Sequence, residues 1–135
     1  MRIYVTGYGV ISSIGENVEE TVLSLKSEKT GIKQGQKPFT ERFKVGEISR
    51  TNEELVRHFG LTQSASRTAL LGMIAAKEAF YGHELRADIR TGLISGTSVG
   101  GMDTSEIAYK DFLKDESDDL NSYRNHPSGT TSEQI

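Results

Sequence analysis

The chain has 135 residues, a net charge of −3, 35% hydrophobic and 26% charged residues, and a mean hydropathy of −0.46. This is the composition of one globular domain; it lacks the basic excess of a nucleic-acid surface, and no apolar run reaches the ~18 residues of a membrane span. The chain contains no cysteine, which excludes disulfides, thiolate metal ligands and a cysteine nucleophile within it. We therefore expect a cytoplasmic protein with no nucleic-acid or membrane partner.

The first element predicted along the chain is a strand at residues 2–11, which is rich in β-branched and aromatic side chains. Gly7 and Gly9 interrupt this strand within the stretch YVTGYGVISSIG. Glycine inside a strand indicates that another backbone approaches closely, so we expect a contact there.

From Asn17 onward the apolar spacing becomes helical, with Asn17 as the N-cap and Gly31 as the expected end of the helix. The next segment is polar, with a short strand predicted at residues 43–48. Asn52 is expected to cap a short helix that Gly60 closes.

The longest predicted helix covers residues 64–82 and is apolar over more than half of its circumference. Such a helix is expected to be buried inside the domain. Ala75, Ala76 and Ala79 are small residues near its end, and we expect them in the centre of the packing.

A second strand followed by glycines is predicted in TGLISGTSVGG, and a D-x-x-E capping box at Asp103 is expected to open the next helix. A T-x-x-Q capping box at Thr131 predicts one more helix start. The sequence ends within the first turn of that helix. Because an isolated turn is unstable in water, we expect the chain to be truncated.

Neither glycine loop has the chemistry of a phosphate cradle. In the first, Ser12 stands where a dinucleotide fingerprint requires glycine. In the second, Met102 and Asp103 stand where a phosphate loop requires Lys and Ser or Thr. These glycines therefore predict sites where chain segments cross.

The histidines predict no metal site. His58, His83 and His126 share no ligand spacing such as i, i+4. His58 lies near the end of the predicted short helix and His83 follows the end of the long one, positions where a cation suits the helix dipole, and His126 lies in a polar loop.

Three segments, in order, resemble β-ketoacyl-acyl carrier protein synthases. RIYVTGYGVISSIGENVEETVLSLKSEKTGI resembles the family's N-terminal strand, loop and helix. SRTALLGMIAAKEAF is similar to its long buried helix, and TGLISGTSVGGMDTSE resembles its next strand with a glycine loop. The resemblance covers nearly the whole chain, although Ser13 replaces a usual proline and Ser98 a common glycine.

The resemblance implies an α/β, thiolase-like fold of two related halves, with residues 1–135 forming most of the first. It also implies a decarboxylative Claisen condensation between an acyl thioester and malonyl-acyl carrier protein. The family's cysteine, histidines and lysine would all follow Ile135, so no catalytic residue is expected in this chain. The implied partners are acyl carrier protein, with its phosphopantetheine thioesters, and a second subunit of a homodimer or related heterodimer; no metal or cofactor is implied.

The resemblance places one candidate substrate-binding region in the chain, the acyl-pocket wall at Gly100, Gly101, Met102 and Ser105. Two alternatives stay open at this point. One is a non-catalytic, chain-length-factor type partner of a ketosynthase, and the other is a binding module without chemistry. A cysteine at the next strand-to-helix junction encoded after Ile135 would indicate the active enzyme, and its absence would indicate the non-catalytic partner.

Overall fold

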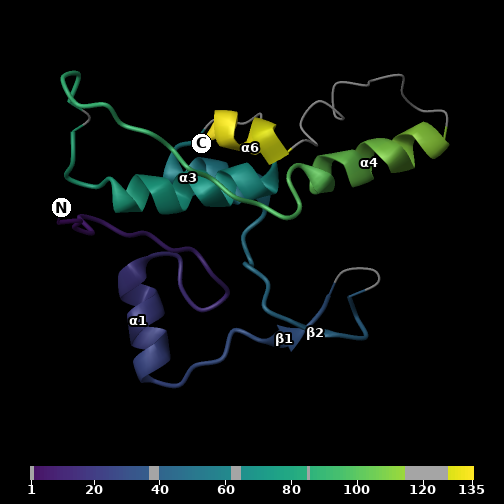
Figure 1. Ribbon diagram of the computed structural model, residues 1–135. Helices are drawn as coiled ribbons and strands as arrows, with labels where there is room; N and C mark the ends of the chain where they lie inside the picture. The colour runs from purple at the N-terminus through teal and green to yellow at the C-terminus, as the bar shows by residue number, and fades with distance from the viewer. Residues whose placement is uncertain (1, 37–39, 62–64, 85, 115–127) are drawn as a thin grey trace. The chain divides into compact units, whose positions relative to one another are not determined.

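The computed structural model describes residues 2–36, 40–61, 65–84, 86–114 and 128–135 (Figure 1). Its elements are five helices and two short strands within these residues: α1 (Val18–Lys26), β1 (Lys33–Gln34), β2 (Lys44–Val45), α2 (Asn52–Phe59), α3 (Arg67–Ala79), α4 (Met102–Leu113) and α6 (Ser128–Gln134). The described fold is thus mainly helical with a small sheet. No helix in the described residues has the length and apolarity to cross a membrane.

The chain divides into two compact units. The first comprises Met1–Thr51 and Ile74–His83, and the second comprises Asn52–Met73 and Glu84–Ile135. The division falls inside α3, so each unit contains part of this helix.

In the first unit, α1 begins as the sequence predicts. The Asn17 side chain accepts a hydrogen bond from the backbone N–H of Glu20 at 2.8 Å, which confirms Asn17 as the N-cap. The helix ends at Lys26, with Ser27 as C-cap, and not at Gly31 as expected. Glu28 has φ of +53°, a left-handed conformation that ends the helix, and Lys29 donates its backbone N–H to the carbonyl of Ser24 at 2.9 Å.

The only sheet in the described residues joins β1 and β2 antiparallel, with Lys33 opposite Val45 and Gln34 opposite Lys44. The strand expected at residues 43–48 is therefore only two residues long. Phe43 closes a turn by donating its N–H to the carbonyl of Thr40 at 2.9 Å, which limits the strand on one side.

The strands expected at residues 2–11 and in TGLISGTSVGG are absent from the described structure, and this expectation was wrong. Ile3 and Val5 are 82% and 84% exposed, and Ile94 is fully exposed. A strand is defined by a ladder of hydrogen bonds to a neighbour, and no described segment pairs with these residues. These residues have the composition of a strand, but without a neighbouring strand to pair with they form no sheet in the described structure.

In the second unit, Leu55 of α2 and Ala69 and Leu70 of α3 are almost completely buried and form the apolar core. Gly60 follows α2 with φ of +62°, which confirms its predicted role in closing the helix. Before α3, Ser66 is fully buried, and its hydroxyl accepts from the N–H of Ala69 at 3.3 Å.

The burial expected along α3 is correct for its middle and wrong for its end. Leu70 and Ile74 are buried, whereas Ala75, Ala76 and Ala79 are only half-buried. At this end of the helix the backbone carbonyls of Ala79 and Ala75 lie against Gly7 and Gly9 of the same unit.

Both capping boxes predicted near the C-terminus were wrong. Gly101 is the N-cap of α4, and Asp103 lies inside the helix. Thr131 lies inside α6, where it is 2% exposed. A capping pattern needs only two residues, so it also occurs by chance within a helix.

Candidate functional site

The turn before α4 is built by Thr97 and a left-handed glycine. The Thr97 hydroxyl accepts hydrogen bonds from the backbone N–H groups of Val99 at 3.2 Å and Gly100 at 3.1 Å. Gly100 has φ of +52°, a conformation that glycine adopts without strain. This turn directs the chain into α4.

The four residues predicted to line an acyl pocket lie together at this helix start. Gly100, Gly101 and Ser105 are buried, whereas Met102 is 41% exposed. Thr104 fixes the first turn by donating its hydroxyl to the carbonyl of Gly101 at 2.7 Å. Within the described residues the start of α4 thus combines one exposed apolar side chain with small buried neighbours in sequence.

Asp103 has a role that the sequence did not reveal. Its Oδ2 accepts a hydrogen bond at 2.9 Å from the backbone N–H of Arg67, the first residue of α3. Asp103 thus caps α3 from a distant part of the chain, satisfying a donor that helix geometry leaves free. Arg67 in turn donates from Nη1 to Oδ1 of Asn52 at 2.8 Å, so one small network joins α2, α3 and α4.

The first glycine loop is a backbone contact, as predicted. A Cβ placed on Gly7 would lie 2.0 Å from the carbonyl oxygen of Ala79, and one on Gly9 would lie 2.0 Å from that of Ala75. Real atoms do not approach so closely, so only glycine fits at both positions. The same prediction was wrong for Gly96, where an added Cβ would have no neighbour within 4 Å.

Glu78 of α3 fixes this loop from both sides. Its Oε2 accepts from the backbone N–H of Val10 at 2.9 Å, and its Oε1 accepts from that of Val18 at 2.8 Å. Val18 is the first residue of α1, so the carboxylate occupies a helix N-terminal donor that would otherwise be free for a phosphate. No spacing in the sequence indicated this pairing, because the partners are 60 and 68 positions away.

The histidines of the described residues take structural positions. The ring of His58 packs edge-on against Phe59 with centroids 4.7 Å apart, and His58 lies in the last turn of α2 as predicted. Nε2 of His83 is 3.1 Å from the carbonyl oxygen of Thr6. His126 lies outside the described residues, and among those described no three His, Asp or Glu side chains gather as metal ligands.

Comparison with known proteins gives one consistent class. The chain is 29% identical over 120 residues to the 3-oxoacyl-[acyl-carrier-protein] synthase 2 of Staphylococcus aureus (strain MRSA252), a match covering 84% of this chain. It is 32% identical over 114 residues to the 3-oxoacyl-[acyl-carrier-protein] synthase 1 of Haemophilus influenzae (strain ATCC 51907 / DSM 11121 / KW20 / Rd), covering 79% of this chain. No protein-family profile matches the chain.

The similarity extends over most of this chain and over a small part of the relatives. The matched region makes up 29% of the Staphylococcus aureus synthase and 28% of the Haemophilus influenzae synthase. The chain is therefore similar to one region of 3-oxoacyl-[acyl-carrier-protein] synthases.

Proposed function

We propose that this chain is the N-terminal part of a 3-oxoacyl-[acyl-carrier-protein] synthase with a thiolase-like fold, and that residues 1–135 form most of the first of its two α/β halves. The observation that carries the proposal is the similarity to two synthases at 29% and 32% identity over about four fifths of the chain. The three sequence segments that resemble the family lie within this length and follow the family's order.

The proposed reaction is a decarboxylative Claisen condensation in fatty acid or polyketide-type synthesis. An acyl group is held as a thioester on a cysteine, and malonyl-acyl carrier protein loses carbon dioxide. The resulting carbanion attacks the acyl carbon, the thioester bond to the cysteine breaks with release of its thiolate, and the ketoacyl product stays on the carrier protein. The chain has no cysteine, so the nucleophile belongs to a part of the enzyme that these residues do not supply. We therefore expect the 135-residue chain alone to form neither an acyl-enzyme nor a ketoacyl product.

The part of the reaction assigned to this chain is contact with the acyl group. Gly100, Gly101 and Ser105 are small and buried beside the partly exposed Met102 side chain. We propose that Met102 packs on the acyl chain while its neighbours leave room for it. The partners of the complete protein are then acyl carrier protein and a second synthase subunit, in the cytoplasm.

The proposal is tested in a chimera in which residues 1–135 replace the matched 120-residue region of the Staphylococcus aureus synthase 2. Condensation is followed with acyl- and malonyl-acyl carrier protein, and acylation by intact-protein mass spectrometry. We expect both ketoacyl product and acyl-enzyme. A chimera that is folded by circular dichroism yet neither acylates nor condenses contradicts the proposal.

A second variant of the chimera tests the acyl contact. Met102→Ala enlarges the proposed pocket and is expected to raise the relative rate with longer acyl chains. Lys110→Ala, an exposed position on the same helix, is the matched control and should leave the acyl-length profile unchanged. Identical profiles for both variants would remove Met102 from the acyl pocket.

A further inference from the structure

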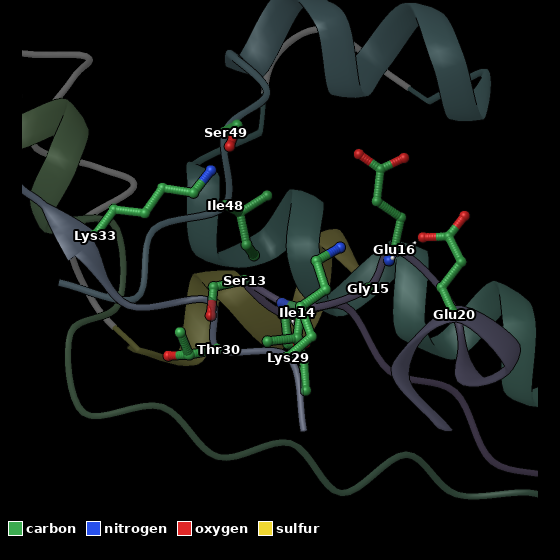
Figure 2. A pocket seen from close by; sticks show the side chains of 11 residues that line it. Ser13, Ile14, Gly15, Glu16, Glu20, Lys29, Thr30, Lys33, Ile48 and Ser49 are labelled. Carbon is green, nitrogen blue, oxygen red and sulfur yellow. Dashed lines mark hydrogen bonds between the residues drawn. The ribbon is translucent and has the colours of Figure 1, made fainter. Parts of the chain in front are cut away.

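The first unit contains a hollow of about 250 Å³ at the surface (Figure 2). Three segments form it together with Glu20 of α1: residues 12–16, then Lys29, Thr30 and Lys33, and residues 48–49. All three belong to the unit formed by Met1–Thr51 and Ile74–His83, so the hollow lies within one compact body. The proposed acyl contact at α4 is in the other unit and does not involve it.

Hydrogen-bond donors dominate the wall of this hollow. Lys29 and Lys33 contribute two ammonium groups, and Ser13, Thr30 and Ser49 contribute hydroxyls. Within the described residues, no carboxylate forms an ion pair with either lysine. Figure 2 shows both lysine side chains among the groups that surround the hollow.

The Ser13 side of the hollow is built around glycine. A Cβ on Gly31 would lie 2.4 Å from the Ser13 hydroxyl oxygen, and one on Gly46 would lie 3.1 Å from it. Glycine at position 31 is therefore required for the hydroxyl to occupy its place. This packing holds the Ser13 donor within a fixed framework.

The two carboxylates of the wall already have partners. Glu16 binds the guanidinium of Arg50 through both oxygens, at 2.5 Å to Nε and 2.9 Å to Nη2. Oε2 of Glu20 accepts the backbone N–H of Glu16 at 2.9 Å. The Glu16 charge is thus compensated by Arg50, and the lysine charges remain available to a ligand.

We propose that this hollow binds the phosphoryl group of a small phosphomonoester. Lysine is a point charge with three rotatable donors, which suits a tetrahedral oxyanion, whereas planar carboxylates are better matched by the fork of an arginine. The hydroxyls of Ser13, Thr30 and Ser49 come from three segments of the wall. They donate hydrogen bonds to different oxygens of the tetrahedral phosphoryl group. Ile14 and Ile48 in the wall pack against the organic part of the ligand.

This site differs from the phosphate cradle that the sequence excludes. In a glycine-loop cradle the backbone N–H groups of a helix start bind the phosphate, and here that donor of α1 is occupied by Glu78. The inferred site instead uses side chains from loops on both sides of α1 and from the segment after β2. It is independent of the proposed synthase function.

The test uses the 135-residue chain and isothermal titration with inorganic phosphate and with glycerol 2-phosphate, at constant ionic strength set with sodium chloride. Lys29→Gln/Lys33→Gln removes the two charges of the hollow. Lys26→Gln/Lys44→Gln removes two exposed lysines that do not line it and is the matched control. Circular dichroism checks that both double variants fold, as expected for exposed positions.

We expect saturable binding to the unmodified chain, weakened by about tenfold or more in the Lys29/Lys33 variant because charge-assisted bonds are lost. The control variant should change the dissociation constant less than about twofold, since exposed charges outside the site are screened. If both variants bound the probes equally weakly, the binding would reflect only general attraction of anions to positive charge. That result would contradict the proposed site. Absence of saturable binding of both probes to the unmodified chain would overturn it as well.

Discussion

Two segments of the chain look alike in sequence and differ in structure. Each combines β-branched residues with closely spaced glycines, YVTGYGV near the N-terminus and TGLISGTSVGG further on. Gly7 and Gly9 lie against the carbonyls of α3, where no side chain fits. Gly92 and Gly96 have nothing within 4 Å of where a Cβ would be.

The difference shows that the spacing of glycines in the sequence does not indicate whether they lie in a close backbone contact or in an open segment. In the first segment the glycines and Glu78 work together, because close approach to α3 brings the backbone of Val10 within reach of the carboxylate. In the second segment no comparable anchor acts on Gly92 or Gly96, and Ile94 between them is fully exposed. The glycines of the first segment are packed against α3, whereas in the second segment packing begins only at the turn of Thr97 and Gly100 that leads into α4.

The largest effect is expected from Gly9→Ala. The new Cβ would lie 2.0 Å from the carbonyl oxygen of Ala75, so the loop or the helix must move. We expect the free energy of unfolding to fall by ~3 kcal/mol or more. The loss is measured as a lower denaturant midpoint of unfolding, with the m-value unchanged from that of the unmodified chain.

Gly96→Ala is the matched control for this substitution. It adds the same methyl group where nothing lies within 4 Å and where φ is not positive. Alanine has less backbone freedom than glycine in the unfolded chain, so it loses less conformational entropy on folding. We therefore expect the free energy of unfolding to be unchanged or raised by up to ~1 kcal/mol. Equal destabilisation by the two substitutions would contradict the distinction between the segments.

Glu78→Gln is expected to have the next largest effect. The amide keeps one acceptor oxygen but turns an N–H₂ toward a backbone donor, so one of the two bonds to Val10 and Val18 is lost. Loss of a hydrogen bond to a charged group costs about 1.5–3 kcal/mol. Unfolding by urea measures the loss.

The control for Glu78→Gln is Glu84→Gln, which removes the same charge from an exposed residue of the other unit. A surface change of this kind should stay within ~0.5 kcal/mol. If Glu78→Gln is equally mild, the carboxylate does not hold the loop.

The sequence predicted some local features of this protein correctly, although the end of α1 and both C-terminal capping boxes were wrong. The N-cap at Asn17 and the glycine that closes α2 depend on neighbouring residues, and both were confirmed. The contact glycines Gly7 and Gly9 were also predicted, because glycine within a β-branched run commonly marks the close approach of another backbone. The cap and the closing glycine are determined within a few residues, whereas at Gly7 and Gly9 the sequence indicated a contact but not its partner on α3.

The features that the sequence did not predict depend on residues far apart in the chain. Asp103 caps α3 from 36 positions away, and no pattern distinguishes it from a residue that caps its own helix. The expected strands at residues 2–11 and in TGLISGTSVGG had the right composition, but pairing also requires a neighbour. The candidate acyl-pocket residues came from family resemblance, and their grouping at the start of α4 follows from their spacing.

A smaller effect is expected from Glu16→Gln, which tests whether ion pairing also holds the first segment. Glu16 and Arg50 have side chains that are 28% and 34% exposed, so solvent screens the pair. The two-point geometry is favourable, and we expect a loss of ~0.5–1 kcal/mol. The loss should shrink in 1 M sodium chloride, where the screening length is about 3 Å. A salt-independent loss would indicate packing as the cause.

The smallest effect is expected at Arg86 and Asp88, which precede the second glycine segment. Nε and Nη2 of Arg86 lie 3.0 Å and 2.6 Å from the two carboxylate oxygens of Asp88. The Arg86 guanidinium therefore holds the pKa of the Asp88 carboxyl below its ordinary value of 3.8. Arg86→Gln should return the carboxyl titration toward that value, as followed by NMR between about pH 2 and pH 5.

The effect of this pair on stability has a defined sign. A carboxyl whose pKa is lower in the folded state stabilises above its unfolded pKa, and this stabilisation disappears as the pH falls through the folded pKa. Both side chains are 65% exposed and only two positions apart, so the unfolded chain can form the same pair. The pKa difference between folded and unfolded chains should therefore be small, and Arg86→Gln should leave the unfolding midpoint unchanged at pH 7. A clear shift of the midpoint, lost at low pH, would mean that this part of the chain is anchored as firmly as the loop at Gly7 and Gly9.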